Sequence, residues 1–172
     1  GVDMVAQHEG WANADDIDLL QSDGLSTSQI KQGSNADYKA LYNKVKNADL
    51  NSDPDLLAEV EANFDIDNMF DYYIFESFYG NTDPGNVRFY RNTKSGDGKW
   101  RYLVFDMDWG LFNATGKSKG VEYAIGGVSY YMNENGAGSQ KIKSNLFVRK
   151  LVQVPQYREK FLRRYAELFN SV

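Results

Sequence analysis

The pattern of apolar residues predicts two amphipathic helices early in the chain. From Asp37 onward, apolar residues recur every three or four positions, as on one face of a helix. A second helix is expected after Asp53 and Pro54, because proline fits the first turn of a helix. Residues 1–35 show no sustained periodicity, apart from a short run at 16–20 that could form a helical turn. The stripe of the first helix comprises Tyr38, Leu41, Tyr42 and Val45.

The strongest helical pattern lies between Asp65 and Gly80. Asp65 is a suitable N-cap, and glycine is the residue that most often follows the end of a helix. Apolar residues cover almost the whole circumference of this segment, which is typical of a helix in the middle of a core. One side carries Ile66, Met69, Phe70, Tyr73, Ile74 and Phe78, and the other carries Tyr72, Phe75 and Tyr79.

After this helix the period of the pattern changes to two. Residues 87–91 and 100–105 alternate as strands, and the Ser-Gly-Asp-Gly sequence at 95–98 is typical of a hairpin turn. The later stretch 113–143 carries many glycine, serine and asparagine residues and is too long for an ordinary connection. We expect it to act as an activation or substrate loop.

Two further helices are predicted near the end of the sequence. Ser144 can cap a short helix that extends to Val152, and Pro155 opens the last one. Together the elements predict one α+β domain that is mostly helical around a single hairpin. The basic residues of the last helix are expected on a solvated face; they are Arg158, Lys160, Arg163 and Arg164.

Composition and charge exclude several classes of function. With 19 Lys and Arg against 24 Asp and Glu, and a net charge of −5, the chain lacks the basic face that nucleic acids require. It has no cysteine, so disulfides and cysteine-based zinc sites are excluded. No apolar stretch is long enough to predict a membrane span. His8, the single histidine, is expected at the surface rather than in a metal site.

Acidic and amide side chains gather at both ends of the predicted hairpin. Asp83 and Asn86 precede the first strand or open it, and Asp106 and Asp108 follow the second. If the second strand continues, the two later carboxylates share one face by alternation. Because a hairpin brings its two ends together, we expect these four side chains to form one site. Carboxylate and amide oxygens are the ligands that Mg²⁺ prefers.

The order of these groups is that of a kinase active site. Kinases use an Asp that accepts the proton of the attacking hydroxyl, an Asn shortly after it, and a metal-binding Asp beyond a short hairpin. Here Asn86 follows Asp83 by three residues, whereas the usual interval is five. The pattern therefore predicts phosphoryl transfer, with a shortened catalytic loop.

Several motifs together resemble the CotH family, whose members are spore-coat and secreted proteins with an atypical kinase fold. The resemblance rests on residues 66–83, on Asn86, on residues 99–110 and on the segment 154–161. It implies a kinase C-lobe-like fold around the hairpin. The activity it implies is ATP- and Mg²⁺-dependent phosphorylation of Ser or Thr in a protein.

The resemblance also implies roles for individual residues. Asp83 matches the catalytic aspartate and Asp106 the metal-binding one, while Asn86 and Asp108 are candidates for further Mg²⁺ ligands. The implied partners are a protein substrate and coat or cellulosomal proteins, without nucleic acid or membrane. The implied location is a spore coat or the cell surface.

Residues 1–172 are expected to form a partial domain without the nucleotide-gripping lobe of a kinase. The segment before Asp83 contains no G-x-G-x-x-G pattern and no predicted strand with a central Lys beside Val or Ile. We therefore expect this chain alone to bind ATP weakly without turning it over, and the full-length protein to turn it over. The lysines of this segment that we expect to be solvated are Lys31, Lys39, Lys44 and Lys46.

Other functions fit the sequence less well. An EF-hand that starts at Asp65 fails, because Phe70 occupies the position of the required glycine. A glycosidase needs carboxylates on opposite sides of the scissile bond, whereas Asp106 and Asp108 would point from one face. The main alternative is a non-catalytic, kinase-like scaffold or interaction module.

Overall fold

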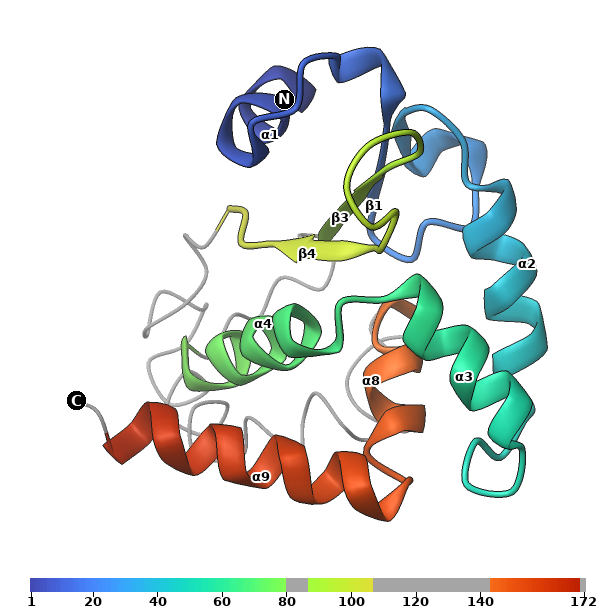
Figure 1. Cartoon of the computed structure of the whole chain (residues 1–172), viewed down its shortest axis with the longest axis vertical. Helices are drawn as coiled ribbons and strands as arrows, with labels where there is room; N and C mark the ends of the chain where they lie inside the picture. The colour runs from blue at the N-terminus through green and yellow to red at the C-terminus, as the bar shows by residue number, and fades with distance from the viewer. Residues whose placement is uncertain (80–86, 107–142, 171–172) are drawn as a thin grey trace, which may run out of the picture.

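The computed structural model describes residues 1–79, 87–106 and 143–170, which form helices packed on a small sheet (Figure 1). The helices are α1 (Val2–Glu9), α2 (Ala36–Val45), α3 (Pro54–Asn63), α4 (Ile66–Tyr79), α8 (Leu146–Leu151) and α9 (Pro155–Asn170). The strands are β1 (Ile17–Gln21), β2 (Ile30–Gln32), β3 (Arg88–Asn92) and β4 (Arg101–Leu103). The predicted α+β class is therefore confirmed.

The sheet is larger than the single hairpin that the sequence predicts. Its strand order is β2-β1-β3-β4, and each neighbouring pair is antiparallel. The β3–β4 hairpin is confirmed, but the run at 16–20 forms most of β1 instead of a helical turn. This strand is buried on both faces, so it lacks the alternation by which an amphipathic strand is recognised. Its members Ile17, Asp18, Leu19 and Leu20 are at most 4% exposed.

β2 provides a second correction in the same region. The sequence predicts no strand with a central lysine before Asp83, but Lys31 stands at the centre of β2, directly after Ile30. β2 has only three residues, of which the middle one is exposed and the other two are half-buried. A strand of this length is too short to identify from its sequence pattern. The Lys31 side chain is exposed, as predicted.

A buried ion pair joins β1 to β3. Asp18 is 4% exposed, and its Oδ2 accepts a hydrogen bond of 2.9 Å from Nε of Arg91. Its Oδ1 accepts the backbone N–H of Ser34 at 2.7 Å. Arg91 also contacts Asp37 of α2 at 2.7 Å. Because a buried charge is tolerated only with such partners, this network explains how an aspartate can stand inside β1.

The helices cover the two faces of the sheet unequally (Figure 1). On one face, α1 covers a small cluster that includes Val5, Ile17 and Tyr90. On the other face lies the main core, to which α2, α3, α4, α8 and α9 all contribute. The largest of its fully buried side chains are aromatic and include Trp100, Tyr38, Tyr73, Phe64, Phe70, Phe89 and Phe147.

The predicted helices α2, α3 and α4 are confirmed, and so are two of their caps. All four residues of the predicted α2 stripe are buried. Asp53 accepts the N–H of Leu56 at 3.0 Å and caps α3. Asp65 accepts the N–H of Asn68 at 3.0 Å and caps α4. Helix capping therefore accounts for both Asp53 and Asp65. For Asp65 this agrees with the expectation that no EF-hand starts there.

α4 is central, but its C-terminal half is open on one side. Tyr73 is 2% exposed, whereas Phe75 and Phe78 are 39% and 52% exposed. The prediction that core surrounds this helix is therefore wrong for the side that carries these two phenylalanines. The sheet, α8 and α9 cover the other sides of α4. On the side of Phe75 and Phe78, Leu168 and Phe169 of α9 cover the helix only in part.

The two C-terminal helices follow the prediction closely. Pro155 opens α9 as expected. α8 begins with Asn145 at its N-cap, so the predicted cap at Ser144 is wrong by one residue. The Ser144 carbonyl instead accepts a hydrogen bond of 2.9 Å from the hydroxyl of Tyr73, and this contact links the start of α8 to α4.

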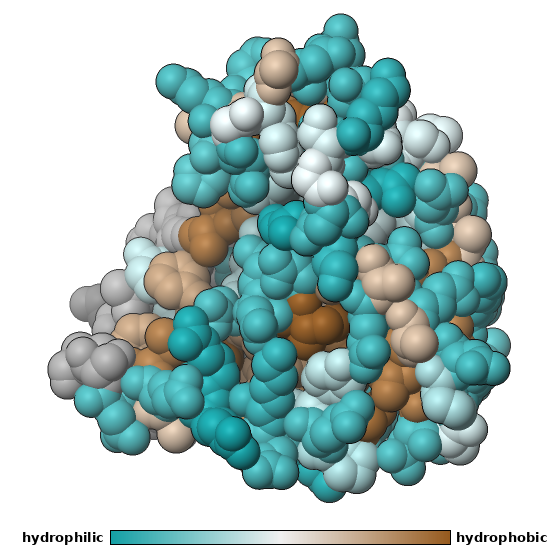
Figure 2. Space-filling view, viewed as in Figure 1, coloured by the Kyte–Doolittle hydropathy of each residue, from teal (hydrophilic) through white to brown (hydrophobic). Residues whose placement is uncertain are grey.

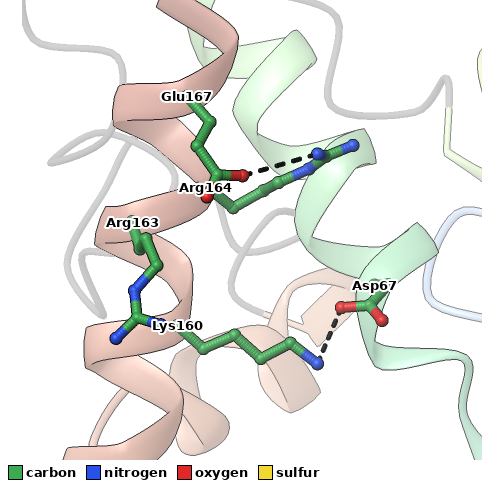
Figure 3. Close-up of a pocket in the computed structure, with 5 residues that line it drawn as sticks. All are labelled: Asp67, Lys160, Arg163, Arg164 and Glu167. Atoms are coloured by element: carbon green, nitrogen blue, oxygen red, sulfur yellow. Dashed lines mark ion pairs between the residues drawn. The ribbon is translucent and has the colours of Figure 1, made fainter.

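α4 and α9 run parallel, and charged contacts join the first half of α4 to the middle of α9. Lys160 pairs with Asp67 at 2.7 Å, and one turn later Arg164 pairs with Asp71 at 2.6 Å. Figure 3 shows Lys160 reaching across to Asp67 from the opposite helix. The basic residues of α9 are thus at the surface as predicted, and two of them hold α4. The face shown in Figure 2 is mainly hydrophilic, with apolar side chains visible between polar ones.

Two buried tyrosines differ in whether the hydroxyl has a partner. Among the residues that the structure describes, the Tyr38 hydroxyl has none, whereas that of Tyr73 donates to Ser144. We expect Tyr73→Phe to lower the free energy of unfolding by about 1 kcal/mol, the usual net value of a hydrogen bond. We expect Tyr38→Phe to leave it unchanged or slightly higher. Urea unfolding of both variants checks this, and equal losses would contradict it.

Candidate functional site

The start of β3 and the end of β4 lie at the same end of the sheet. Arg88 stands opposite Leu103 in the antiparallel ladder. Beyond the ladder, the guanidinium carbon of Arg88 lies 3.5 Å from the centre of the Phe105 ring. The carbonyl of Val87 accepts the N–H of Ser22 at 2.8 Å, which ties this end to the residue after β1. The hairpin therefore brings Arg88 and Phe105 together at one end of the sheet.

α4 runs in the same direction as β4 and ends on the same side. Asn68, near the start of α4, contacts the backbone of Tyr102. One turn later the ring of Tyr72 stacks on that of Tyr102, with 5.1 Å between the centroids. Further along, Phe75 lines the same hollow as Val104. The C-terminal half of α4, the start of β3 and the end of β4 therefore lie on the same side of the fold (Figure 1).

Of the predicted site residues, the structure places Asp106. This residue is exposed and lies three residues beyond the end of β4. Asp83, Asn86 and Asp108 lie outside the described residues, as does nearly all of the predicted loop 113–143. Whether Asp83 and Asp106 face one cleft therefore stays a prediction.

The second strand does not continue to Asp106. β4 ends at Leu103, and Val104 is 47% exposed although Trp100 and Tyr102 are 1% and 4% exposed. Asp106 itself has a positive φ of 54°. The predicted alternation of side chains through this residue is therefore wrong, because the left-handed conformation turns the chain away from strand geometry. Aspartate is among the few residues that adopt this conformation readily.

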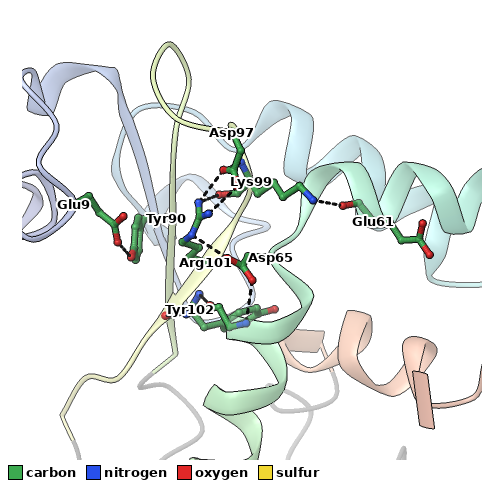
Figure 4. Close-up of polar contacts among 9 residues, drawn as sticks. Glu9, Glu61, Asp65, Tyr90, Asp97, Lys99, Arg101 and Tyr102 are labelled. Atoms are coloured by element: carbon green, nitrogen blue, oxygen red, sulfur yellow. Dashed lines mark hydrogen bonds and ion pairs between the residues drawn. The ribbon is translucent and has the colours of Figure 1, made fainter. Parts of the chain in front are cut away.

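Ion pairs hold the N-terminus of α4 against the hairpin. Arg101 on β4 contacts the cap residue Asp65 at 3.1 Å and the turn residue Asp97 at 2.7 Å, as Figure 4 shows. The backbone joins the same elements, since the N–H of Asp65 donates to the Trp100 carbonyl at 3.0 Å. Lys99 donates a bond of 2.9 Å to the carbonyl of Glu61, which holds the end of the preceding helix α3 at the same place. The start of α4 is thus fixed to β4 at several points.

The network shifts two pKa values in physically clear directions. The side-chain hydrogen bonds from Arg101 lower the pKa of Asp97 to about 2. Across the sheet, the hydroxyl of Tyr90 donates to Glu9 of α1 at 2.6 Å (Figure 4). Burial, followed by this hydrogen bond, raises the pKa of Tyr90 well above its ordinary value. Both groups keep their usual charge at neutral pH and serve to join elements.

Sequence reasoning missed Asn68 and the Asp65–Arg101 pair. Both bring the helix that precedes Asp83 into contact with the strand that precedes Asp106. The only sequence signal for Asn68 was an amide beside Asp67 in the first turns of a mostly apolar helix, which did not distinguish it from the other polar residues of that helix. The partner on β4 could not be read from the sequence, because the register of α4 against the strand is a tertiary property.

Within residues 1–79, 87–106 and 143–170, there is no group of three or more His, Cys, Asp or Glu side chains that could hold a metal ion. His8 is exposed on α1, as predicted. In the same part of the chain, none of the helices has the length and apolar character needed to cross a bilayer.

Comparison with known proteins gives a family match that extends over nearly the whole chain. The family described as CotH kinase protein matches residues 6–172. No curated protein and no solved structure matches the chain significantly.

The positive φ of Asp106 predicts how substitutions there change stability. Asp106→Gly and Asp106→Val both remove the carboxylate, but only glycine adopts a left-handed conformation without cost. We expect the valine variant to be less stable than the glycine variant by about 1–2 kcal/mol, the usual range for such backbone strain. Urea unfolding measures the difference. Equal stabilities would show that the backbone at this position is not left-handed in solution.

The lowered pKa of Asp97 predicts a pH-dependent contribution to stability. Its value of about 2 lies below the ordinary 3.8, so its stabilising effect is present above pH 4 and is lost as the pH falls toward 2. The side chain is 44% exposed, so we expect an effect below about 1 kcal/mol. The difference in unfolding free energy between the native protein and Asp97→Asn should shrink from pH 5 to pH 2. A difference that stays constant over this range would contradict the pairing.

Proposed function

The chain belongs to the CotH kinase family, and we propose that it carries the metal-binding and catalytic part of an atypical kinase that phosphorylates Ser or Thr in proteins. The observation that supports this most directly is that the C-terminal half of α4, the start of β3 and the end of β4 lie on one side of the fold, with Asp106 beyond β4. Asp83 lies in the connection between α4 and β3, and Asp108 follows β4. Helix, acidic connection, hairpin and acidic exit follow one another as in a kinase catalytic lobe.

We assign the kinase-like catalytic lobe to the layer formed by α4, the β3–β4 hairpin, α8 and α9. α4 supplies a rigid base for the connection that carries Asp83, because its first turns are joined to β4 by backbone and side-chain contacts. α4 lies between the sheet and α9, while Phe78 in its last turn and Asp106 beyond β4 are exposed at the surface. A protein substrate could therefore reach Asp106 without entering the core.

The available donors suit Mg²⁺. Asp106 presents an exposed carboxylate at the end of β4, and Asp108 and Asn86 would add a second carboxylate and an amide oxygen. When bound there, Mg²⁺ would neutralise negative charge on the phosphates of ATP. The exposed position of Asp106 leaves room for substrate oxygens beside the protein ligands.

Asp83 is assigned the role of the general base. Its carboxylate would accept the proton of the substrate hydroxyl as the hydroxyl oxygen forms a bond to the γ-phosphorus. The bond between this phosphorus and the β–γ bridging oxygen breaks, and ADP leaves with the bridging oxygen. A carboxylate at hydrogen-bond distance from the hydroxyl also orients the nucleophile, which is the larger part of its task in phosphoryl transfer.

Family membership also suggests where the protein acts. We propose a spore coat or the cell surface as its location, with coat or cellulosomal proteins as the partners to be tested first. The alternative is a non-catalytic, kinase-like scaffold at the same location. A measurement of phosphoryl transfer distinguishes the two.

The test is phosphoryl transfer to a coat-protein substrate by the intact protein, followed as incorporation of labelled γ-phosphate with and without Mg²⁺. We expect Asp83→Ala to slow transfer by about 10²- to 10⁴-fold, the usual effect of losing a general base. Asp106→Asn should raise the Mg²⁺ concentration needed for half-maximal rate. Asp97→Asn, at the far end of the same hairpin, is the matched control and should keep the native rate per folded molecule.

Two outcomes would reject parts of this proposal. A native rate in Asp83→Ala would remove that residue from the mechanism. Absence of Mg²⁺-dependent transfer by the native protein, with binding to coat proteins retained, would establish the scaffold instead.

A further inference from the structure

Arg88, at the start of β3, is a half-buried cation without a counter-charge. Its guanidinium carbon lies 3.5 Å from the centre of the Phe105 ring, and its Nη2 donates one long hydrogen bond of 3.4 Å to Oε1 of Gln21. Among residues 1–79, 87–106 and 143–170, no carboxylate pairs with it, and its buried Nε has no hydrogen-bond partner. The guanidinium is therefore held in place without being neutralised.

The other half-buried arginines of the sheet have carboxylate partners. Arg91 of β3 contacts Asp18 at 2.9 Å, and Arg101 of β4 contacts Asp97 at 2.7 Å. Partial burial removes water from a cation, and a protein normally supplies an opposite charge in return. A bound anion would supply at Arg88 what the carboxylates supply at the other two.

Arg88 lies on the face of the sheet opposite the main core. By strand alternation it shares this face with Tyr90, whereas Phe89 projects into the main core. α1 covers Tyr90 on this face (Figure 1). Arg88 stands one row further along, opposite Gln21 and Leu103, and all three residues of this row are half-buried. The guanidinium is thus at the margin of the covered area, where a small anion can reach it.

The stacking on Phe105 prepares the guanidinium for an oxyanion. A ring against its plane leaves the N–H groups on its rim available to a ligand, and the planar fork matches the oxygens of a phosphate group. Gln21 holds one nitrogen of the fork. Because the side chain is already fixed, little rotational freedom is lost when an anion binds.

The neighbouring Asp106 favours phosphate over other anions. It follows Phe105 directly, and its exposed carboxylate is the proposed ligand of Mg²⁺. Mg²⁺ in proteins is usually bound by one or two carboxylates together with phosphate oxygens of the substrate. A carboxylate by itself repels phosphate, and a permanent positive charge nearby reduces this repulsion.

We propose that Arg88 binds a phosphate group of the nucleotide, beside the Mg²⁺ that Asp106 would hold. This inference rests on the proposed function and names a residue that contacts its nucleotide. Phe105 and Gln21 are positioning residues, which orient the guanidinium without contacting the phosphate themselves.

The experiment is a titration of the intact protein with MgADP and, separately, with pyrophosphate, followed by isothermal titration calorimetry. Arg88→Gln removes the charge, Arg88→Lys keeps the charge without the planar fork, and Phe105→Leu removes only the ring. Arg158→Gln is the matched control, because it makes the same change in net charge at an exposed arginine of α9. Thermal unfolding gives the folded fraction, so that each Kd refers to folded molecules.

We expect Arg88→Gln to raise the Kd of both ligands about 10- to 100-fold, the scale of a hydrogen bond to a charged group. Arg88→Lys should lie between the glutamine variant and the native protein. Phe105→Leu should raise Kd about 2- to 5-fold, because the guanidinium loses the ring that holds it. Arg158→Gln should keep the native Kd.

Three results would overturn the inference. The first is an equal Kd in the native protein and folded Arg88→Gln, and the second is an equal loss in Arg158→Gln, which would reduce the effect to net charge. The third is a native protein that binds neither ligand at millimolar concentration. A phosphoserine peptide distinguishes the source of the phosphate: if the peptide binds through Arg88 and MgADP does not, the assignment to the nucleotide is wrong.

Binding and transfer together separate this inference from the proposed function. If the native protein transfers no phosphate but binds MgADP through Arg88, the transferase proposal fails and the phosphate site stands. If the native protein transfers phosphate while Arg88→Gln keeps the native Kd for MgADP and the native KM for ATP, the phosphate site fails and the transferase proposal stands.

Discussion

The burial of one aromatic face of the sheet is the constraint on which the rest of the structure depends. Phe89 of β3, Trp100 just before β4 and Tyr102 of β4 project into the main core. The rings of Phe89 and Trp100 contact Tyr38 of α2, with 4.7 Å between the centroids of Phe89 and Tyr38. Complete burial of a large apolar side chain contributes about 1.5–3 kcal/mol, whereas an exposed ion pair contributes about 0–1 kcal/mol. The aromatic layer therefore decides where the helices lie.

The polar contacts refine an arrangement that apolar burial has already established. Arg101 and Asn68 fix the angle of α4 against β4, and Lys160 fixes α9 against α4. These bonds are directional, so they select one register among the many that an apolar surface alone would permit. The buried Asp18–Arg91 pair acts similarly between β1 and β3.

On the side of the fold where β4 ends, the well-packed elements α4 and β4 lie near the exposed residue Asp106. α4 has its fixed contacts with β4 in its first turns and its exposed phenylalanines further along. Asp106 lies beyond β4 in a backbone conformation that costs free energy. Backbone strain of this kind is frequent at functional sites, where surrounding contacts hold it in place.

Much of this protein was determined by its sequence alone. The spacing of apolar residues identified α2, α3, α4 and α9, and the change of period identified the β3–β4 hairpin, because these patterns report local geometry directly. The motifs at residues 66–83, 86, 99–110 and 154–161 indicated the CotH family, whose match covers residues 6–172.

Only the tertiary structure decided the rest. β1 is buried on both faces and carries an aspartate whose partner lies 73 residues away, so local periodicity carries no sign of it. The left-handed turn at Asp106 and the open side of α4 likewise follow from what surrounds them. Asn68 is one of several polar residues in α4, and its partner on β4 could not be identified from the sequence. A sequence pattern records which side chains can be buried, whereas the contacts between distant segments depend on how the whole chain packs.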